Sequence, residues 1–273
     1  MELAVDHSAV HRRRAPQPGA LQDVLAELGE RVKPIALARE KTMPVAHPFD
    51  RLLPDGLMRG QVVSCRGSGA RSVAFGLVST ALAEGAWMAV IDVPTFGTDA
   101  AAELGVPLER VVRVETNAVG SSGSGWVDVM GAAVDGFDLV LTRVPAELHD
   151  RRPAAVRKLN SRVRQKGAVV VTLGTAGALG GDIELTTQRT SWAGLEDGAG
   201  HLERRVVEVQ ASGRRIPERR SCAIEMVGAG TRVALGVATE RDPQAELLAE
   251  MTATTEKADG VVVTDLNDRR LAG

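Results

Sequence analysis

The chain has 273 residues, of which 44% are hydrophobic and 25% are charged. This length and composition indicate a soluble globular protein with one large domain, and no apolar run approaches the ~20 residues that a membrane-spanning helix needs. The formal net charge is -2, aromatic residues make up 3% and tyrosine is absent, which argues against a surface that binds single-stranded nucleic acid by base stacking.

The first 50 residues are expected to form a flexible segment followed by a helical arm. Residues 1–20 are polar and contain two prolines, and they lack the apolar centre of a secretory signal, so we expect a cytoplasmic protein. Apolar residues at helical spacing then predict a helix with one apolar face. This helix is a candidate partner-docking element, through Leu21, Leu25, Leu28 and Val32.

Residues 51–240 alternate apolar strands with helices. Strands are predicted at Gln61–Cys65 and in the segments AWMAVIDV, ERVVRVE, FDLVLTRV and GAVVVTLG, with helices between them and a glycine- and serine-rich loop at 119–125. In the helix PAAVRKLNSRVRQ, Val156, Leu159 and Val163 are expected to point inward. Continuous apolar strands of this kind predict a mainly parallel sheet with helices on both faces, a mixed α/β fold.

After Gly181 the pattern changes. Three segments, DIELTTQRTSWAGL, HLERRVVEVQASGR and RSCAIEMVG, alternate polar with apolar residues, which predicts an antiparallel extension of the same sheet on its C-terminal side. Residues 241–273 form a tail that we expect to be mobile or bound to a partner. Its one predicted helix is a second candidate docking element, through Leu247, Leu248 and Met251.

The cysteines and histidines form no recognisable ligand pattern. Cys65 and Cys222 are far apart in the sequence and belong to no CxxC spacing, and the five histidines are scattered. We therefore expect buried thiols, no disulfide framework and no metal site.

The segment CRGSGARS resembles a shortened phosphate-binding loop. A functional loop of the GxxxxGK[ST] type wraps phosphates with backbone N–H groups, and it needs a lysine for the β- and γ-oxygens and a hydroxyl for magnesium. Here the loop consists of Gly67, Gly69, Arg71 and Ser72, with one residue between the glycines and no lysine. We interpret the glycines as turn residues of an inactive loop, although Arg71 lies where it could meet an anion.

The order of segments from about residue 50 to 225 resembles the core of a RecA-type recombinase ATPase. That resemblance implies a catalytic glutamate, a metal-binding aspartate and a glutamine that senses the γ-phosphate, each at the end of a strand. The matching positions are Pro94, Arg143 (or Thr142, if the register slips by one) and Gly174. Without these groups, nothing would stabilise the negative charge that develops in the transition state of phosphoryl transfer. We therefore expect no enzyme activity, no catalytic residue and no cofactor.

Two acidic residues remain near these strand ends. Asp138 begins its strand, so it is expected at the wrong edge of the sheet for a metal. Asp92 lies two residues before the expected catalytic position and could face the loop.

An eroded nucleotide loop, an N-terminal helical arm and a variable tail resemble the ImuA family, in particular its actinobacterial ImuA-prime form. The resemblance implies a RecA-like adaptor in SOS-induced mutagenesis and translesion synthesis during DNA repair. Its implied partners are an ImuB-like inactive polymerase homologue and an error-prone polymerase, with RecA or a second copy as further candidates. Two alternatives stay open: a weak nucleotide-binding ATPase of the RecA/KaiC type, and a regulator that binds a recombinase or a cell-division protein.

Positive charge is concentrated between residues 151 and 220. That stretch holds 14 Lys/Arg against 7 Asp/Glu, so it could attract an acidic partner or make a weak, non-specific and salt-sensitive contact with DNA. The same pattern is also that of ordinary solvent-facing charges. The candidate contact residues are Arg151, Arg152, Arg157, Arg162 and Arg164.

Overall fold

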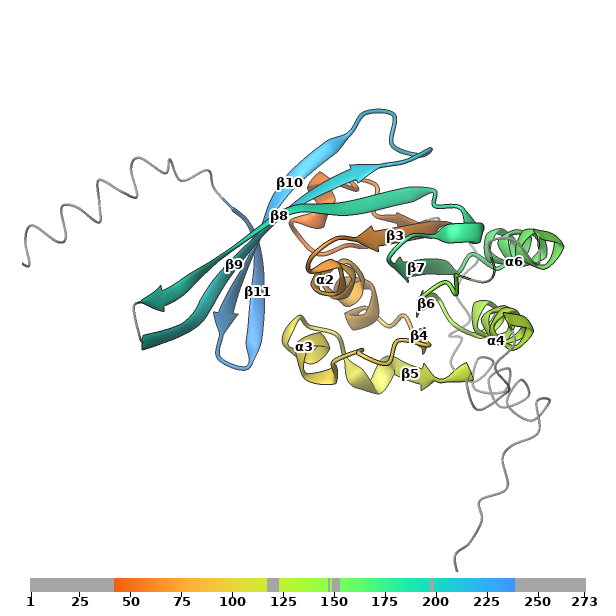
Figure 1. Cartoon of the computed structure of the whole chain (residues 1–273), viewed down its shortest axis with the longest axis horizontal. Helices are drawn as coiled ribbons and strands as arrows, with labels where there is room; N and C mark the ends of the chain where they lie inside the picture. Colours follow the sequence, from red (N-terminus) through yellow and green to blue (C-terminus); the bar gives the residue numbers. More distant parts are fainter. Residues whose placement is uncertain (1–41, 117–122, 147, 149–152, 197–198, 239–273) are drawn as a thin grey trace, which may run out of the picture. The chain divides into compact units, whose positions relative to one another are not determined.

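The computed structural model describes residues 42–116, 123–146, 148, 153–196 and 199–238. Nine strands form one sheet in the order β11-β10-β9-β8-β3-β7-β6-β4-β5 (Figure 1). The strands are β3 (Val62–Arg66), β4 (Met88–Ile91), β5 (Val111–Val114), β6 (Leu139–Thr142), β7 (Val169–Leu173), β8 (Ile183–Glu196), β9 (Ala199–Ser212), β10 (Arg220–Ala229) and β11 (Arg232–Val237). The predicted mixed α/β class is confirmed.

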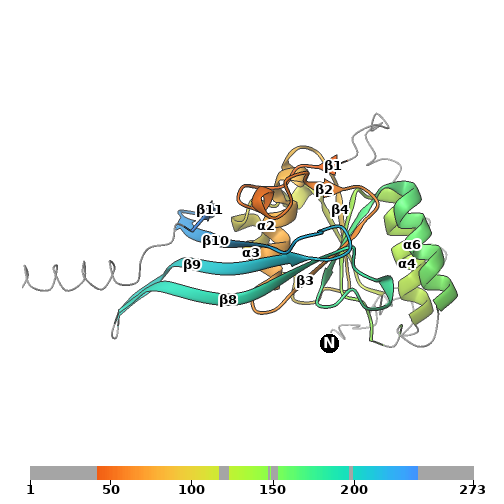
Figure 2. The ribbon, with the colours of Figure 1, turned by 90° about the horizontal axis from the view of Figure 1, so that it is seen from above.

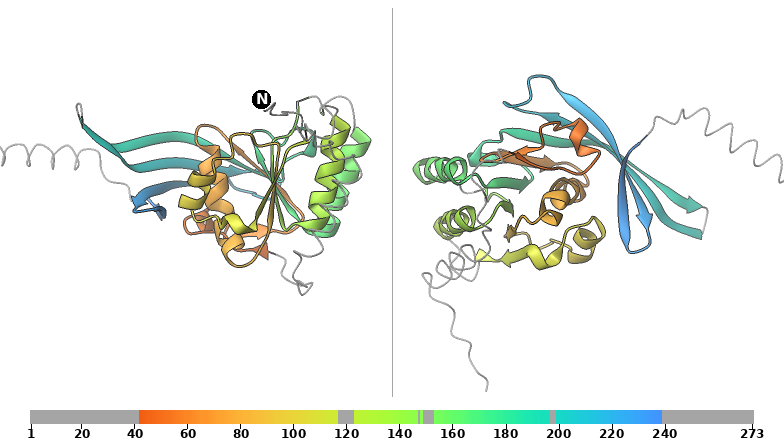
Figure 3. Two further views of the ribbon diagram at one scale, coloured as in Figure 1. Left: turned by 90° about the horizontal axis from the view of Figure 1, so that it is seen from below. Right: turned by 180° about the vertical axis from the view of Figure 1, so that it is seen from behind.

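Helices cover both faces of the parallel half of this sheet. The helices are α2 (Ala70–Ala83), α3 (Thr98–Glu103), α4 (Gly123–Gly136) and α6 (Pro153–Lys166), with short 3-10 turns η1 (Phe49–Arg51), η2 (Leu108–Arg110) and η4 (Gly177–Leu179). Figures 2 and 3 show α2 and α3 on one face and α4 and α6 on the other. Strands buried on both faces need mostly apolar side chains, which explains why β4 is apolar throughout and why β6 and β7 each contain only one polar residue, a threonine.

The sheet changes from parallel to antiparallel at β8. This strand runs parallel to β3, whereas β9, β10 and β11 follow as antiparallel neighbours. The antiparallel extension on the C-terminal side is therefore confirmed. Strand β11 was not predicted, and it forms the outer edge of this half.

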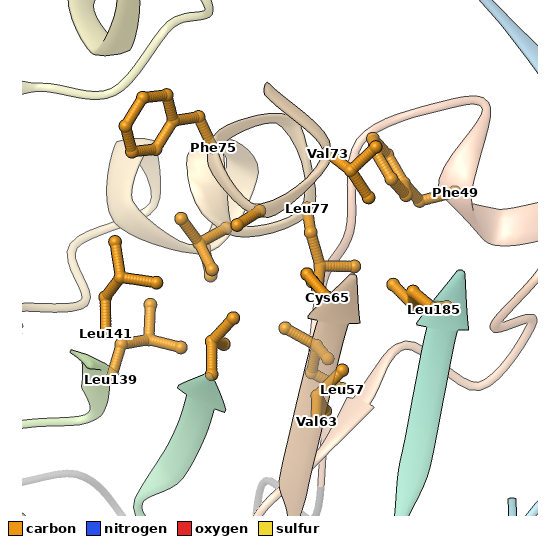
Figure 4. Close-up of a cluster of buried hydrophobic side chains, with 14 of the residues drawn as sticks. Phe49, Leu57, Val63, Cys65, Val73, Phe75, Leu77, Leu139, Leu141 and Leu185 are labelled. Carbon is orange, nitrogen blue, oxygen red and sulfur yellow. The ribbon is translucent and has the colours of Figure 1, made fainter. Parts of the chain in front are cut away.

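Alternating side chains along β3 divide the core into two clusters. Val63 and Cys65 pack under α2, together with Val73 and Leu77 of that helix, as Figure 4 shows. Val62 belongs to the other cluster, beneath α4 and α6. The inward residues predicted for α6 are confirmed, since Val156, Leu159 and Val163 are all buried there. The sheet thus separates two layers of different character.

The packed core begins before residue 51. Strand β1 (Thr42–Met43) pairs with β2 (Leu57–Met58), and the ring of Phe49 is fully buried in the α2 cluster. Residues 42–50, grouped with the arm from the sequence, therefore contribute to the core. A second prediction was also wrong at its boundary: α4 begins at Gly123, inside the segment 119–125 that the sequence predicted to be a loop.

The chain divides into two compact units, Met1–Val237 and Ala238–Gly273. All the elements above belong to the first. The two predicted docking helices, at 21–35 and 244–251, lie outside the described residues. None of the helices in the described part of the chain is long and apolar enough to cross a membrane.

Candidate functional site

The loop between β3 and α2 has the backbone of a strand-to-helix turn with two glycines in the left-handed region. Gly67 has φ 92° and Gly69 has φ 87°, a conformation that glycine adopts without steric cost. Gly69 immediately precedes α2, and no side chain caps the helix there. The N–H of Ala70 donates to the backbone oxygen of Gly67, at 3.2 Å. The N–H groups that follow it belong to the first turn of α2, the part of a helix that binds anions in many proteins.

A guanidinium group from β9 occupies the space beside this loop. A Cβ atom built on Gly69 would overlap the terminal nitrogens of Arg205. Arg205 also donates a hydrogen bond from Nη1 to the hydroxyl of Ser72, at 3.1 Å. In a phosphate-binding loop this hydroxyl would bind magnesium, but here it accepts from a cation. The loop is filled from within the chain.

Arg205 is held in place by its strand register and by an aromatic ring. It lies opposite Trp192 of β8, and its guanidinium carbon is 4.8 Å from the centroid of the indole, within range of a cation–π interaction. Burial lowers the pKa of Arg205, and its Nε atom is buried with no hydrogen-bond partner among the described residues. The tryptophan covers this site yet remains 54% exposed itself.

Thr187 closes the other side of the loop. Its hydroxyl donates to the backbone oxygen of Arg66, at 3.0 Å, and a Cβ atom on Gly67 would lie 2.7 Å from the backbone oxygen of Thr187. Gly67 is therefore required both by its positive φ and by the close approach of β8.

The structure separates Arg71 from the other loop residues. Arg71 is exposed, and its Nη1 donates a hydrogen bond to the backbone oxygen of Thr95. Thr95 follows Pro94, the position at which the RecA resemblance would place a catalytic glutamate, and both residues are exposed. Gly69 and Ser72 thus contact Arg205, and Gly67 contacts Thr187. Arg71 instead bonds to the connection between β4 and α3.

The other two predicted positions, at the ends of β6 and β7, carry a hydroxyl, a guanidinium and bare backbone. Thr142 is fully buried; its hydroxyl accepts from Nε1 of Trp126, at 3.3 Å, and donates to the backbone oxygen of Arg143. Arg143 is exposed. Gly174 has φ 98° and no neighbour within 4 Å of a built Cβ atom, so it presents only backbone to the sheet edge.

Both remaining carboxylates are engaged in structural contacts. Asp92, at φ 51°, accepts hydrogen bonds from the N–H and the hydroxyl of Thr116, at 2.7 and 2.5 Å. This contact fastens the end of β4 to the end of β5. Asp138 pairs with Arg59 at 3.0 Å and accepts from the N–H of Trp87, at the start of β6. In the described part of the chain, no group of three or more His, Cys, Asp or Glu could hold a metal ion.

The candidate arginines of α6 point in different directions. Arg162 forms an ion pair with Asp135 of α4, and this hydrogen bond raises the pKa of Arg162. Arg157 and Arg164 are exposed, two helical turns apart on one side of the helix. Arg151 and Arg152 lie outside the described residues. The candidate arginines among the described residues therefore do not form one continuous surface.

Sequence reasoning missed Arg205, Trp192 and Thr187. One signal was available, because in the segment RRVVEVQ residue 205 shares the alternating phase of Val207 and Val209, which are buried in the α2 cluster. A charged residue in the phase of buried ones requires a partner inside. Cys65 and Cys222 are free and buried, as expected.

Residues 51–178 match the family model of the MT3502 N-terminal domain. This match covers the loop and the strands from β3 to β7, and it ends before β9, which carries Arg205. It falls short of half of the chain.

One curated relative is the uncharacterized protein Rv3395c of Mycobacterium tuberculosis (strain ATCC 25618 / H37Rv). It is 32% identical over 104 residues, which are 38% of this chain and 48% of the relative. The match therefore spans about half the length of that protein. Neither the family description nor the name of the relative refers to DNA repair.

Proposed function

We propose that this protein is a non-catalytic RecA-like adaptor of translesion synthesis, which bridges an ImuB-like polymerase homologue and an error-prone polymerase. The observation that carries the non-catalytic half is the guanidinium of Arg205 beside Gly69 and Ser72. The guanidinium would exclude a phosphate through the space it fills and not through its charge. It adds to the partial positive charge of the α2 N-terminus, but it occupies the place where a nucleotide phosphate would have to meet the N–H donors of that helix.

The strand ends support the same proposal. Pro94, Thr142 and Gly174 supply neither a base nor a metal ligand, and Asp92 is engaged with Thr116. Phosphoryl transfer depends on groups that stabilise the charge of its transition state. A RecA-like sheet that lacks them retains its surfaces, and surfaces are what an adaptor uses.

The adaptor half of the proposal rests on family resemblance, since a fold alone does not determine function. The glycine loop after the first core strand and the order of the strands that follow it are what the RecA resemblance rests on, although Pro94 stands where that family carries its catalytic glutamate. The match to the MT3502 N-terminal domain covers the same segment. The resemblance to the ImuA family extends this proposal to a cytoplasmic complex with an inactive polymerase homologue and an error-prone polymerase.

The first test is thermal unfolding of the full chain with ATP, ADP or a non-hydrolysable analogue, with and without magnesium. We expect no shift in Tm for the wild type. A ligand at 100 times its Kd would add about 2.7 kcal/mol of stability, so binding would be readily seen. The matched variants are Arg205→Ala, which empties the space beside Gly69, and Arg71→Ala, which leaves that space filled.

A wild-type shift in Tm that disappears in Arg71→Ala would contradict the proposal and favour the nucleotide-binding alternative.

The second test is co-purification with an ImuB-like protein and an error-prone polymerase, each supplied as a purified tagged component. We expect a stable complex in gel filtration. If the protein instead captured a recombinase filament and formed no complex with the polymerase proteins, the alternative of a regulator that binds a recombinase would be favoured.

A further inference from the structure

A cavity of about 640 Å³ lies on the face of the sheet opposite the glycine loop. Its walls come from α6, from the connection between β7 and β8, and from the end of β9. This volume is within the range of small-molecule sites, about 300–1,000 Å³. The lining includes Ser64, Asn160, Arg164, Gly180, Glu184 and Arg214.

Polar side chains run beneath this face from strand to strand. In the sheet register Ser64 of β3 lies beside Glu184 of β8 and beside Thr172 of β7. Thr172 in turn lies beside Thr142 of β6. Thr172 is fully buried, and its hydroxyl has no hydrogen-bond partner among the described residues. Hydroxyl groups here interrupt an otherwise apolar layer, which is unusual for a sheet face that serves only as core.

One wall of the cavity has an acceptor that lacks a donor. The Nδ2 atom of Asn160 donates to the backbone oxygen of Leu179, at 2.8 Å. The Oδ1 atom of the same amide is buried without a partner in the described part of the chain. A buried acceptor without a donor is unfavourable, so a ligand that donates to Oδ1 would bind more tightly than one that cannot.

The charges around the cavity leave one cation unneutralised. Arg214 pairs with Asp182 at 3.1 Å, and Glu184 pairs with Arg66 at 3.2 Å. Among the described residues, Arg164 forms no ion pair or hydrogen bond. The wall therefore carries a net positive charge, which favours an anionic ligand group.

Glycines of the β7–β8 connection leave room for a ligand to approach the backbone. Gly180 has φ 65°, and a Cβ atom built on it would meet nothing within 4 Å. Gly181 is close to Ser64, since its built Cβ atom would lie 3.6 Å from the serine hydroxyl oxygen. The connection thus presents bare backbone above the hydroxyl of Ser64.

From these contacts we propose that the cavity is a binding site for a small organic anion. Its carboxylate or phosphate group binds Arg164, and an N–H or O–H group at its other end donates to Oδ1 of Asn160. This site lies on the opposite face of the sheet from Arg205 and does not depend on the proposed adaptor function.

The test uses amide spectra of the uniformly ¹⁵N-labelled full chain, titrated with three probes. N-acetylglutamate offers carboxylates and an amide N–H, glycerol 3-phosphate offers a phosphate and hydroxyls, and inorganic phosphate offers an anion alone. We expect saturable chemical-shift changes at the backbone amides of Gly177, Gly180 and Gly181 with at least one organic probe. The probe that binds shows whether the site takes a carboxylate or a phosphate. We expect the protein to bind that probe more tightly than inorganic phosphate.

The matched variants are Arg164→Gln and Arg157→Gln, which remove the same charge from the same side of α6. Both residues are exposed, but only Arg164 lines the cavity. We expect Arg164→Gln to weaken binding at least about tenfold, as the loss of a charge-assisted hydrogen bond implies. We expect Arg157→Gln to change it less than about twofold, because its distance leaves only a screened interaction.

Three results would overturn the proposal: no saturable shift with either organic probe, equal weakening by the two variants, or equal affinity for inorganic phosphate. Equal weakening would indicate a diffuse basic surface, the kind that binds DNA non-specifically. Failure of the adaptor proposal is measured separately, by nucleotide-dependent Tm and by polymerase complexes, and leaves these outcomes unchanged.

Discussion

At the scale of single residues, the glycine loop is fixed by two contacts of different stiffness. Gly69 faces the end of the Arg205 side chain, whose rotatable bonds let it move aside if it gives up its contacts with Trp192 and Ser72. Gly67 faces the backbone oxygen of Thr187, which belongs to a paired strand and cannot. The two glycines therefore have unequal tolerance to a methyl group.

We predict that Gly67→Ala destabilises the protein by about 1–3 kcal/mol more than Gly174→Ala. Both residues have positive φ, at 92° and 98°, so both variants carry the same kind of backbone strain. Only Gly67 would also meet Thr187, since Gly174 has open space. The measurement is urea unfolding of the two variants, and equal losses of unfolding free energy would refute the steric argument.

A second prediction at this scale concerns the thiol of Cys65. Burial raises the pKa of Cys65 from 9.0 to about 12, so the folded state retains a proton that the unfolded state releases near pH 9. The stability that this provides is fully present below pH 9 and is lost as the pH rises towards 12. Each pH unit within that window lowers the unfolding free energy by about 1.4 kcal/mol.

The measurement is the unfolding free energy between pH 8 and about pH 10.5 under reducing conditions, for the wild type and for Cys65→Ala. We expect the variant to lose stability less steeply above pH 9, whatever its stability at neutral pH. If the unfolding free energies of the wild type and of Cys65→Ala fell in parallel with pH, the Cys65 thiol would have the same pKa in the folded and the unfolded protein.

At the scale of elements, α2 is packed closely against the segment before β2 and against β11. A Cβ atom on Gly76 would lie 2.9 Å from the ring of Phe49 and 3.2 Å from a methyl group of Leu235. Glycine inside a helix costs about 1 kcal/mol relative to alanine. Its presence here is explained by the approach of these two side chains.

We predict that Gly76→Ala is destabilising despite its better helix propensity, and that Phe49→Leu relieves it. The smaller side chain leaves space for the added methyl group, so the double variant should be more stable than the sum of the single effects, by about 0.5–3 kcal/mol. A double-mutant cycle from urea unfolding measures this coupling. Additive effects would show that the ring and Gly76 do not interact.

The elements themselves were largely predictable, whereas the contents of the loop were not. Val156, Leu159 and Val163 recur at helical spacing, β4 is apolar throughout, and β7 is apolar except for Thr172, so local pattern suffices for these elements. The contact between Arg205 and Gly69 depends instead on the pairing of β8 with β9, which shifts register between Thr187 and Arg189. Periodicity does not specify such a shift, so this part of the site could not be derived from sequence.

At the scale of the whole molecule, the described residues contain a complete core. Two clusters cover the two faces of the sheet, and their members extend from Met43 to Met226. The glycine loop belongs to one face and the cavity to the other. Ser64 and Cys65 are neighbours in β3, yet they belong to opposite faces.

We predict that a fragment of residues 42–238 unfolds cooperatively, with a Tm within a few degrees of that of the full chain. The control is a fragment of residues 51–238, which lacks Met43 and Phe49. Loss of a buried phenylalanine costs about 3–5 kcal/mol, so we expect this fragment to have a clearly lower Tm. Calorimetry of both fragments tests the boundary, and equal Tm values would restore residue 51 as the start of the core.

The exposed indole of Trp192 has a practical consequence. The chain contains no tyrosine and three tryptophans, of which Trp126 is buried and Trp87 stacks with Arg110 elsewhere. Trp192 is thus the fluorophore in direct contact with the guanidinium that fills the glycine loop. Any event that displaces Arg205 must change the environment of that ring. The fluorescence of Trp192 therefore reports whether Arg205 still fills the glycine loop. The variant Trp192→Phe gives the background fluorescence of the other two tryptophans.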